Sequence, residues 1–397
     1  MADALGALAL GWALIAGNVE LEAVRRFVFA RRAEARTEAA RDARVLLIRP
    51  CAGRDPWLDE TLISLARARR SFSLTCRLAI ADPDDSAYPV AVHAAMALSV
   101  QGIDTTVVLT APRGPNRKAA QLAAVVAAEA ASFDVIMIAD GDVDLADMDL
   151  DTLIAPLVLR PDLGAVWAPP VEAGRERTLG DRASAALLGA SLHAFPLLAR
   201  LDRRGLVGKL FAVRRDALAE VGGFAALTAH LGEDMELARR LHACGRGIEA
   251  APIIARSLSS GRSWEQAEDR FGRWLKVIRA QRPSLLASYP LLFFATLPII
   301  VLAAFAAPAS PALSAIAAAI ALTLRLAVAR TAAVAAGRRL PITRIAMDAL
   351  LADLLLACAF VRALRSRRVV WRDVALRIGR GGQLCLLEEK GDGSPAR

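Results

Sequence analysis

Two aspartates separated by a glycine, Asp140-Gly141-Asp142, end an apolar segment near the middle of the chain. Residues 135–139, which precede them, have the length and composition of a buried strand. Carboxylate oxygens are the ligands that Mg²⁺ and Mn²⁺ prefer, and the glycine lets the backbone approach a ligand closely. The triplet therefore predicts a divalent cation beside the diphosphate of a nucleotide. An acidic turn that caps the next helix is the alternative, and it is the better interpretation of the triplet in isolation.

Polar residues that suit the same chemistry occur in three other segments. Asp82 follows an apolar segment in the same way as Asp140. Lys118 stands at the predicted start of a helix, after a Gly-Pro-Asn turn, where phosphate or ribose can be bound. Glu233 and Asp234 stand at another helix start, where a carboxylate could take a proton from an acceptor hydroxyl. Helix capping is the alternative interpretation of these two acids.

A basic helix is predicted around the sequence Arg-Phe-Gly-Arg-Trp at residues 270–274. Arg270 and Arg273 are three residues apart and therefore share a face of this helix, with Trp274 beside them. The alternative to a role in a site is a basic amphipathic helix on an anionic membrane surface. Three further cations fit that alternative: Lys276, Arg279 and Arg282.

The elements that must position these residues lie between residues 38 and 282. Short apolar segments rich in β-branched residues alternate there with alanine-rich segments of helical character, at 59–70, 88–102 and 117–132. This alternation predicts an α/β domain with a mostly parallel sheet. Ligands bind outside the carboxyl ends of the strands in such sheets, which is where the aspartates of the two strand ends are expected.

The chain begins with an apolar segment, residues 4–16, which small residues extend to about residue 18. No lysine or arginine precedes it, as a signal peptide would require, whereas several arginines follow from Arg25 onward. The positive-inside rule then predicts an uncleaved anchor over residues 1–20, with its N-terminus outside and the α/β domain in the cytoplasm. A buried or interfacial helix is the alternative.

Three long apolar stretches, 284–307, 311–336 and 343–361, make the last third of the chain membrane-like. Charges at membrane depth are costly, so we expect those in the second and third stretches to pair between helices rather than bind a ligand. If the basic segment after these stretches is cytoplasmic, an even number of them crosses, and we expect the proline-broken first stretch not to span. The charged residues concerned are Arg325, Arg330, Asp348 and Asp353.

The composition narrows the possible functions. Hydrophobic residues make up 55% of the chain and the formal net charge is +9, which suits an anionic membrane surface or an anionic substrate. Aromatic residues are only 5%, and no basic segment is interleaved with them, so no nucleic-acid partner is expected. The five cysteines are scattered without a CxxC pair, which indicates neither a zinc site nor a disulfide framework.

Taken in order, Asp82, the 140–142 triplet, the 233–234 acids and the 270–274 segment resemble the arrangement of glycosyltransferase families 2 and 21. The resemblance is greatest to membrane ceramide glucosyltransferases and the related bacterial hopanoid-associated glycosyltransferases. The segments RPCAGRDPWLDETLISL, ADPDDSA, GPNRKAAQL and VVWRDVALRIGRGGQL are similar to motifs of that branch. The resemblance therefore spans about residues 45–384.

Three positions depart from the family pattern. Gln121 replaces the usual asparagine of the turn motif, and Arg270 stands where many relatives have glutamine. The C-terminal motif lacks its tyrosine, and Ala375 and Leu376 stand near that position. None of these departures removes an expected catalytic acid, but they leave the acceptor open.

The resemblance implies an α/β fold, the A-type glycosyltransferase (nucleotide-diphospho-sugar transferase) domain, with N-terminal and C-terminal membrane helices. The protein would be a multi-pass integral membrane protein of a bacterial inner membrane, with its catalytic domain facing the cytoplasm. We expect four parts: a transmembrane anchor at 1–20, a glycosyltransferase domain at 38–282, a membrane region at 283–361, and a basic cytoplasmic segment with a flexible tail at 362–397.

The resemblance also implies a role for each candidate residue. Asp82 would bind the uracil or ribose of a UDP-sugar, and Lys118, Asp140 and Arg270 would help to hold the donor. Asp142, with Asp140, would bind Mg²⁺ or Mn²⁺ across the diphosphate. Three residues complete the set: Asp234 as the base for the acceptor hydroxyl, Arg273 as the cation that stabilises the departing UDP, and Trp274 at the acceptor entrance.

These roles predict an inverting, metal-dependent transfer of a hexose from a UDP-sugar to the primary hydroxyl of a membrane lipid. UDP-glucose and ceramide are the first choices, and a hopanoid acceptor with N-acetylglucosamine or glucose as donor sugar is the second. A processive polysaccharide synthase is the third choice, although such enzymes normally need more membrane spans. A non-catalytic membrane scaffold would be expected to lack Asp142 or Asp234. A nucleotidyltransferase would show a glycine-rich phosphate loop, which residues 49–56 do not provide.

Overall fold

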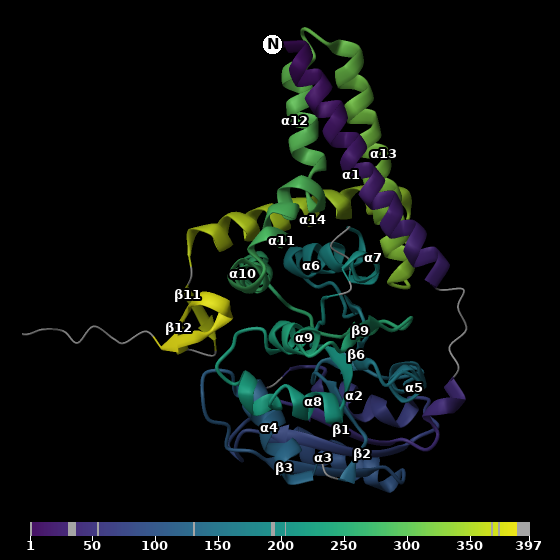
Figure 1. The fold of residues 1–397 in the computed structure, drawn as a ribbon, viewed down its shortest axis with the longest axis vertical. Coiled ribbons are helices and arrows are strands. Elements are labelled where there is room, and N and C mark those ends of the chain that lie inside the picture. Colours follow the sequence, from purple (N-terminus) through teal and green to yellow (C-terminus); the bar gives the residue numbers. More distant parts are fainter. Residues whose placement is uncertain are drawn as a thin grey trace, which may run out of the picture.

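A stalk of three helices stands on an α/β domain in this computed structural model (Figure 1). Both ends of the sequence contribute to the stalk, since α1 (Ala2–Ala30) packs against α12 (Thr296–Ala306) and α13 (Pro311–Ala335). The structure describes the following residues: 2–30, 37–53, 55–129, 132–191, 195–202, 204–366, 368–371 and 374–386.

A central sheet of seven strands organises the α/β domain: β1 (Arg44–Pro50), β2 (Ser73–Ile80), β3 (Asp104–Leu109), β4 (Val135–Ala139), β6 (Leu163–Trp167), β8 (Leu210–Arg214) and β9 (Gly247–Ala250). Their order is β3-β2-β1-β4-β8-β6-β9. β8 runs antiparallel to β4 and β6, and the other neighbouring strands pair in parallel. The predicted mostly parallel sheet is therefore confirmed, with one reversed strand.

Helices cover both faces of this sheet because successive side chains of a strand point to opposite faces. Val45 and Leu47 join one core cluster, whereas Leu46 and Ile48 join the other. The first cluster is completed by α2 (Leu58–Ile63), α3 (Tyr88–Val100) and α5 (Asp151–Leu159). The second is completed by α4 (Arg117–Glu129), α8 (Arg215–Glu220) and α9 (Glu233–Ala243). Short helical turns connect these elements: η1 (Thr37–Ala40), η2 (Ser64–Arg67) and η4 (Phe224–Leu227).

A small second sheet extends the strand ends on which the site is built. It consists of β5 (Val143–Asp144), β10 (Ala255–Ser257) and β7 (Pro170–Glu172), in the order β5-β10-β7. β5 directly follows the 140–142 triplet, and its antiparallel partner β10 comes from much later in the chain. The sheet therefore brings residues 257–259 next to the triplet.

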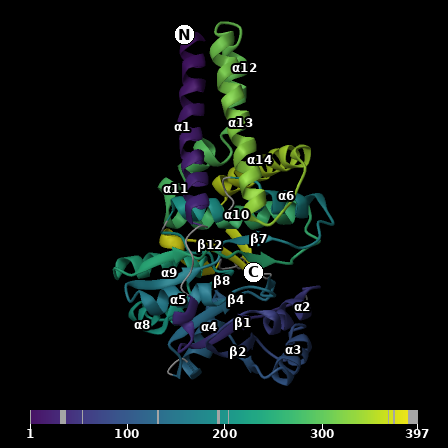
Figure 2. The same ribbon diagram turned by 90° about the vertical axis from the view of Figure 1, so that its right-hand side faces the viewer.

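A layer of four helices lies between the stalk and the α/β domain (Figures 1 and 2). These helices are α6 (Leu179–Gly189), α7 (Phe195–Leu201), α10 (Trp264–Gln281) and α14 (Ile342–Arg365). α10 begins with a reciprocal capping box, in which Ser263 and Gln266 each accept the backbone N–H of the other. α14 packs against α6 and α10 and runs across the base of the stalk.

The helices that could cross a membrane differ from the expectation drawn from the sequence. α1 and α13 are each long and apolar enough, over Asp3–Val28 and Pro311–Ala335. The proline-broken stretch passes the same test as one bent unit, α11 (Pro283–Ser288) with α12, bent by 57°. Among the described helices, α14 is not a candidate span. The expected crossing by the third apolar stretch is therefore wrong: α14 lies across the base of the stalk, because its charged side chains bond to α6 and α13. The expectation that the proline-broken stretch does not span stays a prediction, since its bent pair of helices fits either a broken span or a re-entrant loop.

Those bonds confirm part of the predicted pairing. Arg325 of α13 lies 2.7 Å from Asp353 of α14 and also donates to the carbonyls of Ala190 and Ala349. Asp348, which is 0% exposed, pairs instead with Arg182 of α6 and Arg344 of its own helix, each at 2.9 Å. The remaining charge, Arg330, is exposed on α13.

A third sheet follows α14 and returns the chain to the α/β domain: β11 (Arg368–Trp371), β12 (Val374–Ile378) and β13 (Leu384–Leu386), with the turn η6 (Arg380–Gly382). The backbone of Leu231 donates to Gly382 at 3.0 Å, and that of Leu384 donates to Ala229 at 2.7 Å. The C-terminal segment therefore supports the loop that leads into α9. The predicted flexible tail beyond residue 386 lies outside the described residues.

Candidate active site

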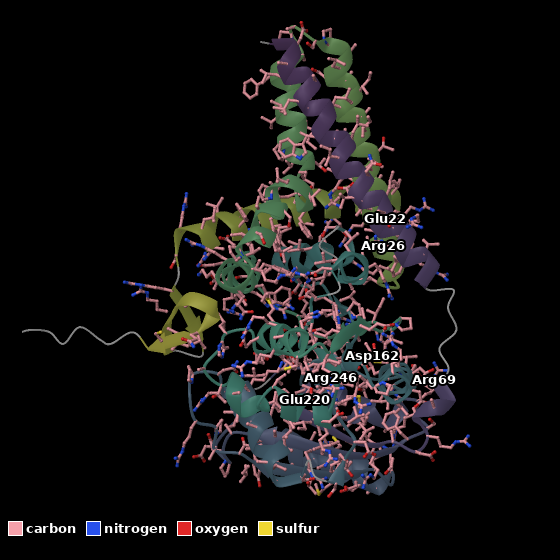
Figure 3. The ribbon with its side chains drawn as sticks, in the orientation of Figure 1. Glu22, Arg26, Arg69, Asp162, Glu220 and Arg246 are labelled. Atoms are coloured by element: carbon pink, nitrogen blue, oxygen red, sulfur yellow. The ribbon has the colours of Figure 1, made fainter. Side chains whose placement is uncertain are left out.

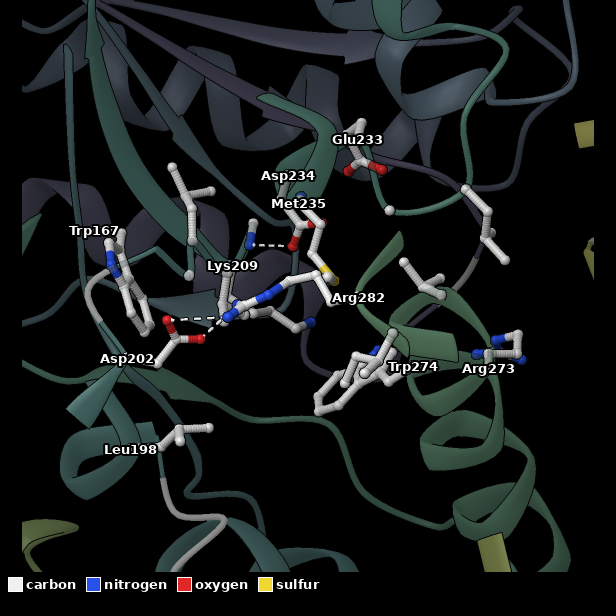
Figure 4. A pocket seen from close by; sticks show the side chains of 18 of the residues that line it. Trp167, Leu198, Asp202, Lys209, Glu233, Asp234, Met235, Arg273, Trp274 and Arg282 are labelled. Carbon is white, nitrogen blue, oxygen red and sulfur yellow. Dashed lines mark hydrogen bonds and ion pairs between the residues drawn. The ribbon is translucent and has the colours of Figure 1, made fainter. Parts of the chain in front are cut away.

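A cavity of about 550 Å³ opens between the carboxyl ends of the central strands and the helical layer (Figure 4). Six of the predicted site residues line it: Lys118, Asp140, Asp234, Arg270, Arg273 and Trp274. Asp142 lies just behind this wall, and Asp82 lies apart from it. Segments that are far apart in sequence therefore meet here, as the motif order led us to expect.

The 140–142 triplet is held by backbone contacts on both sides. Asp140 is the first residue after β4; its N–H donates to the carbonyl of Lys209 at 2.9 Å and its carbonyl accepts from Val143 at 3.0 Å. A side chain at Gly141 would begin 3.2 Å from Leu58 and 3.5 Å from the carbonyl of Pro50. A residue without a side chain therefore fits this turn best.

A buried arginine beneath the triplet fixes its carbonyls. Arg49 is 0% exposed, and its guanidinium donates to the carbonyls of Thr61 at 2.6 Å, Val143 at 2.7 Å and Asp140 at 3.0 Å. Burial lowers the pKa of this guanidinium. Arg49 was not among the predicted site residues, although a charged residue inside the apolar strand at 44–50 was a signal. Arg49 gives the loop its shape from the side opposite the cavity.

Asp142 is the most heavily bonded carboxylate of the triplet. Its oxygens accept from Lys209 at 2.6 and 2.7 Å, from Ser257 at 2.6 Å and from Ser259 at 3.1 Å. Burial alone would raise the pKa of Asp142, but Lys209 and the hydrogen bond from Ser257 hold that pKa below its usual value. The carboxylate is thus kept ionised in a site shielded from water.

Two lysines neutralise the acids around the triplet. Lys209 Nζ lies 3.3 Å from Asp140 as well as 2.6 Å from Asp142. Lys118 Nζ lies 2.7 Å from Asp140 and 3.2 Å from Glu233, and it donates to the carbonyl of Gly208. Burial works against the charge of both lysines, but the neighbouring carboxylates raise both pKa values. Lys209 was missed in the sequence, where a Gly-Lys pair before an apolar strand was the only signal.

The donor set fits a divalent cation. Lys209 Nζ places a positive charge between Asp140 and Asp142, so this pair of carboxylates accommodates a cation. In the described part of the chain, no three His, Cys, Asp or Glu side chains gather as a metal site. Mg²⁺ commonly takes one or two protein carboxylates and completes its shell with water and substrate phosphates. Asp140 and Asp142 are the residues that would hold the ion.

Asp234 faces the cavity from the first turn of α9. The helix starts at a left-handed glycine, Gly232, with φ of +74°. The carboxylate accepts the backbone N–H groups of Gly208 and Met235, each at 2.8 Å. Burial, together with the charge of Glu233, raises the pKa of Asp234 to about 6. A fixed carboxylate with such a pKa is suited to accept a proton near neutral pH.

The neighbouring acid, Glu233, lies among groups that favour its ionised form. Glu233 accepts from Asn116 at 3.0 Å and lies 3.2 Å from Lys118. Although burial alone would raise its pKa, these partners lower it. The two adjacent carboxylates thus differ in proton affinity, with the pKa of Asp234 raised and that of Glu233 lowered.

The backbone of Gly208 links Asp234 to Lys118. Its N–H donates to Asp234 and its carbonyl accepts from Lys118. A side chain at this position would begin 3.2 Å from Asp234 and 3.3 Å from Lys118 Nζ, so it would press on both groups. The sequence offered no signal for this contact.

The basic helix α10 brings Arg270, Arg273 and Trp274 to the same cavity, as their spacing predicts. Arg270 is only 8% exposed; it forms an ion pair with Glu172, and its guanidinium lies 4.8 Å from the ring centre of Trp274. Burial lowers the pKa of Arg270 to about 10. Arg270 therefore orders Trp274, while Arg273 is the more exposed cation of the pair.

Asp82 stands in an exposed turn after β2. Its carboxylate accepts the backbone N–H of Asp84 at 3.0 Å, and it does not line the cavity. It occupies a strand end next to that of β1, on the same edge of the sheet as the triplet. Its predicted contact with a nucleotide stays a prediction.

The other cations of α10 have protein partners. Lys276 donates to the carbonyl of Arg368 at 2.8 Å, and Arg279 donates to the carbonyls of Ala363 and Leu364, both at 2.9 Å. The bonds from Arg279 cap the C-terminal end of α14, where helix carbonyls lack internal partners, and the bond from Lys276 holds the start of β11. Contact with an anionic membrane surface, the predicted role of this face, stays a prediction.

The cavity changes character toward the membrane helices. Its far end is lined by apolar side chains of α7, α10, α11 and the π-helical turn η5 (Tyr289–Phe293), among them Leu198, Ile278, Leu285 and Tyr289. A hydrophobic chain suits this end, whereas the end with Asp140 and Asp234 suits a polar reaction. The cavity is therefore polar at one end and apolar at the other.

Comparisons with known proteins give one family and several solved structures. The model of glycosyl transferase family 21 matches residues 7–384. A mannosyltransferase from Pyrobaculum calidifontis, in complex with GDP-Man and Mn²⁺, is 18% identical with a TM-score of 0.46, over 91% of this chain and 99% of that chain. Glucosyl-3-phosphoglycerate synthase from Mycobacterium tuberculosis, with Mg²⁺ and UDP, is 15% identical with a TM-score of 0.37, over 62% of this chain and 84% of that chain. No curated protein matches the sequence.

Proposed function

Since the chain belongs to glycosyl transferase family 21, we propose that it transfers a hexose from a UDP-sugar to the primary hydroxyl of a membrane lipid. At the coarser level it is a nucleotide-sugar glycosyltransferase with the α/β A-type fold. UDP-glucose and ceramide are the donor and acceptor that we propose first. The observation that carries the proposal is the single cavity, which has Asp140 and Asp234 at one end and apolar side chains toward the membrane helices at the other.

The donor would lie over the carboxyl ends of β1, β2 and β4. Asp82 would contact the uracil or ribose, and Lys118 and Arg270 would hold the donor from either side of the cavity. Asp140 and Asp142 would hold Mg²⁺ or Mn²⁺, which when bound neutralises the diphosphate and improves UDP as a leaving group. The lowered pKa of Asp142 beside Lys209 supports this role, as does the position of Lys118 and Lys209 next to Asp140.

Asp234 would act on the acceptor. Its carboxylate takes the proton of the primary hydroxyl while the hydroxyl oxygen bonds to the anomeric carbon. The bond from that carbon to the diphosphate oxygen breaks in the same step, and Arg273 stabilises the charge on departing UDP. One displacement inverts the anomeric centre, so an α-linked donor yields a β-glycosyl lipid. Trp274 would pack at the entrance for the lipid.

The proposed topology also follows from packing. The C-terminal sheet bonds to the loop before α9, so it must lie on the same side of the membrane as the α/β domain. An even number of crossings would then separate the two, and the bent unit α11–α12 together with α13 would supply them. We propose that α1, this bent unit and α13 cross the inner membrane, with the catalytic domain in the cytoplasm. The arginines after α1 support this orientation.

Purified full-length protein in nanodiscs tests the proposal. UDP-glucose and a short-chain ceramide should give UDP and one glycolipid with a single β-linked sugar, identified by mass spectrometry and nuclear magnetic resonance. EDTA should abolish the reaction, Mn²⁺ should restore it, and Asp142→Ala should not respond to Mn²⁺. Product formation undiminished by EDTA would exclude the metal. A product on a hopanoid polyol alone, or a sugar polymer, would select one of the alternative functions, and the absence of any turnover would select a scaffold.

A further inference from the structure

An ion pair interrupts the apolar part of the cavity wall (Figure 4). Arg282 Nη1 lies 2.5 Å from Asp202 Oδ2, and Nη2 lies 3.4 Å from Oδ1, so the contact uses both carboxylate oxygens. Asp202 follows α7 and Arg282 ends α10, so the pair joins two helices of the layer below the stalk. The Arg282 and Asp202 side chains are 30% and 18% exposed, and both are reachable from the cavity.

The position of this pair is unusual for its surroundings. Leu198, Leu285 and Tyr289 line the cavity on its membrane side. Figure 4 shows the Arg282 side chain extending below Asp234 toward Asp202. A partly buried ion pair contributes little net stability, because the loss of hydration offsets the attraction. An apolar contact would serve packing at least as well here, so the feature of the pair that calls for a function is that both side chains line the cavity.

The charges select the kind of ligand. Asp202 uses only part of the donor fork of Arg282, so guanidinium N–H groups and carboxylate lone pairs remain for a ligand. An anionic headgroup would be repelled by Asp202 and Asp234, and a cationic headgroup by Arg282 and Arg273. A neutral group that both donates and accepts, such as an amide or a second hydroxyl, satisfies both members of the pair.

We propose that Asp202 and Arg282 form an acceptor subsite, which binds a neutral hydrogen-bonding group of the lipid close to the hydroxyl that reacts. The subsite rests on the proposed function, since it assumes a lipid whose hydroxyl reaches Asp234. It makes the enzyme selective for lipids with an amide or second hydroxyl near the headgroup, against simple long-chain alcohols and anionic phospholipids. The hydrocarbon chains extend along the apolar end of the cavity.

Binding and transfer are measured separately with two matched amphiphiles, a short-chain ceramide and a 1-alkanol of equal chain length. Binding to the full-length protein in nanodiscs is followed by calorimetry. The wild type should bind the ceramide about tenfold more tightly than the alkanol, as expected for one or two added hydrogen bonds. Asp202→Asn and Arg282→Gln should remove that preference and leave the alkanol affinity and the affinity for UDP unchanged.

Two further variants control for a merely structural effect. Arg282→Lys keeps the ion pair but loses the planar fork, so it should retain the fold and lose part of the preference. Glu249→Gln removes a surface contact to Arg160, at 2.6 Å, outside the cavity and should change neither affinity.

The outcomes separate the subsite from the reaction. Equal weakening of both amphiphiles in the variants, no preference in the wild type, or tighter binding of an anionic phospholipid would each overturn the subsite. A ceramide preference that depends on the pair, without any sugar transfer, would sustain the subsite and refute the proposed function.

Discussion

The chain contains two clusters of buried charged residues. They differ in whether a charged side chain remains accessible from the cavity. The active-site cluster comprises Lys118, Asp140, Asp142, Lys209, Glu233 and Asp234. The junction cluster comprises Arg182, Arg325, Arg344, Asp348 and Asp353, where α6, α13 and α14 meet. The junction carboxylates each pair with arginine, and none of these five residues lines the cavity. In the active-site cluster, Asp234 faces the cavity and is held by backbone N–H groups.

The two clusters also differ in their cations, which are arginines at the junction and lysines at the active site. Arginine offers several donors in a fixed plane, so Arg325 can bond Asp353 and two helix carbonyls at once. Lysine is a compact charge on a flexible stem, which can stand between two carboxylates and yield its place to another cation. Burial of charge alone therefore does not indicate a site; charged side chains that face a cavity do, and a raised pKa such as that of Asp234 adds to the indication.

The largest expected effect is the loss of the base. Asp234→Asn should reduce transfer by about 10²- to 10⁴-fold while the affinity for UDP is retained. At pH 7 two effects on stability oppose each other. Removal of the ionised carboxylate stabilises the variant, because the raised pKa means that ionisation of Asp234 destabilises the fold, whereas the amide can accept only one of the two backbone N–H groups. Steady-state kinetics and thermal unfolding check both parts. Undiminished turnover would remove Asp234 as the base.

In the junction cluster, loss of a charged residue should lower stability but not turnover. Arg325→Met leaves Asp353 buried without its partner, which should cost about 3–5 kcal/mol in the free energy of unfolding. The double variant Arg325→Met/Asp353→Leu should recover most of that loss, because neither charge remains unpaired. Turnover per folded molecule should not change in either variant. A specific loss of turnover in the stable double variant would contradict a structural role for this pair.

Loss of a hydrogen bond that supports Asp142, a proposed metal ligand, is expected to have an intermediate effect. Ser257 donates to Asp142 at 2.6 Å, so Ser257→Ala should weaken Mn²⁺ binding in the presence of UDP by about 10- to 100-fold. Electron paramagnetic resonance of Mn²⁺ measures this affinity without turnover. The matched control is Ser263→Ala, which removes the cap of α10 and should leave Mn²⁺ affinity unchanged. Equal affinities in wild type and Ser257→Ala would place the ion elsewhere.

The smallest expected effect is the dependence of kcat/KM on pH through the ionisation of Asp234. Since the pKa of Asp234 is raised to about 6, kcat/KM should be constant above that pH and fall about tenfold per pH unit below it. The sign follows from the role, because a base must be deprotonated to accept the hydroxyl proton. A decline that begins only near pH 4 would show that the environment of Asp234 does not raise its pKa. Stability measured over the same range separates acid unfolding from titration of the base.

Much of the fold was predictable because its signals are local. Short apolar segments alternating with helical ones predicted the parallel strands, and β4 is buried along its whole length as expected. The reversal of β8 was not predictable, because strand direction in a sheet depends on packing rather than on composition. The orientation of α14 was also missed, since it depends on Arg182 and Arg325 of other helices.

The candidate site was predictable to the extent that its residues carry distinctive chemistry. The triplet, Asp234 and the arginines of α10 meet at one cavity, as their types and order suggested. Their catalytic roles remain predictions. Arg49 and Lys209 were missed because their local signals, a charge inside or just before an apolar strand, do not say which groups they contact, and Gly208 carries no signal at all.

The sequence by itself determined which chemical groups are present and that carboxylates follow buried strands, because apolar periodicity and strand ends are local properties. Only the tertiary structure decided which groups meet. Asp234 meets Gly208 across 26 residues, Asp142 meets Lys209 across 67, and Arg282 meets Asp202 across 80. Those separations are closed by the packing of helices on the sheet, and the same contacts set the pKa of the base and the polarity of the cavity.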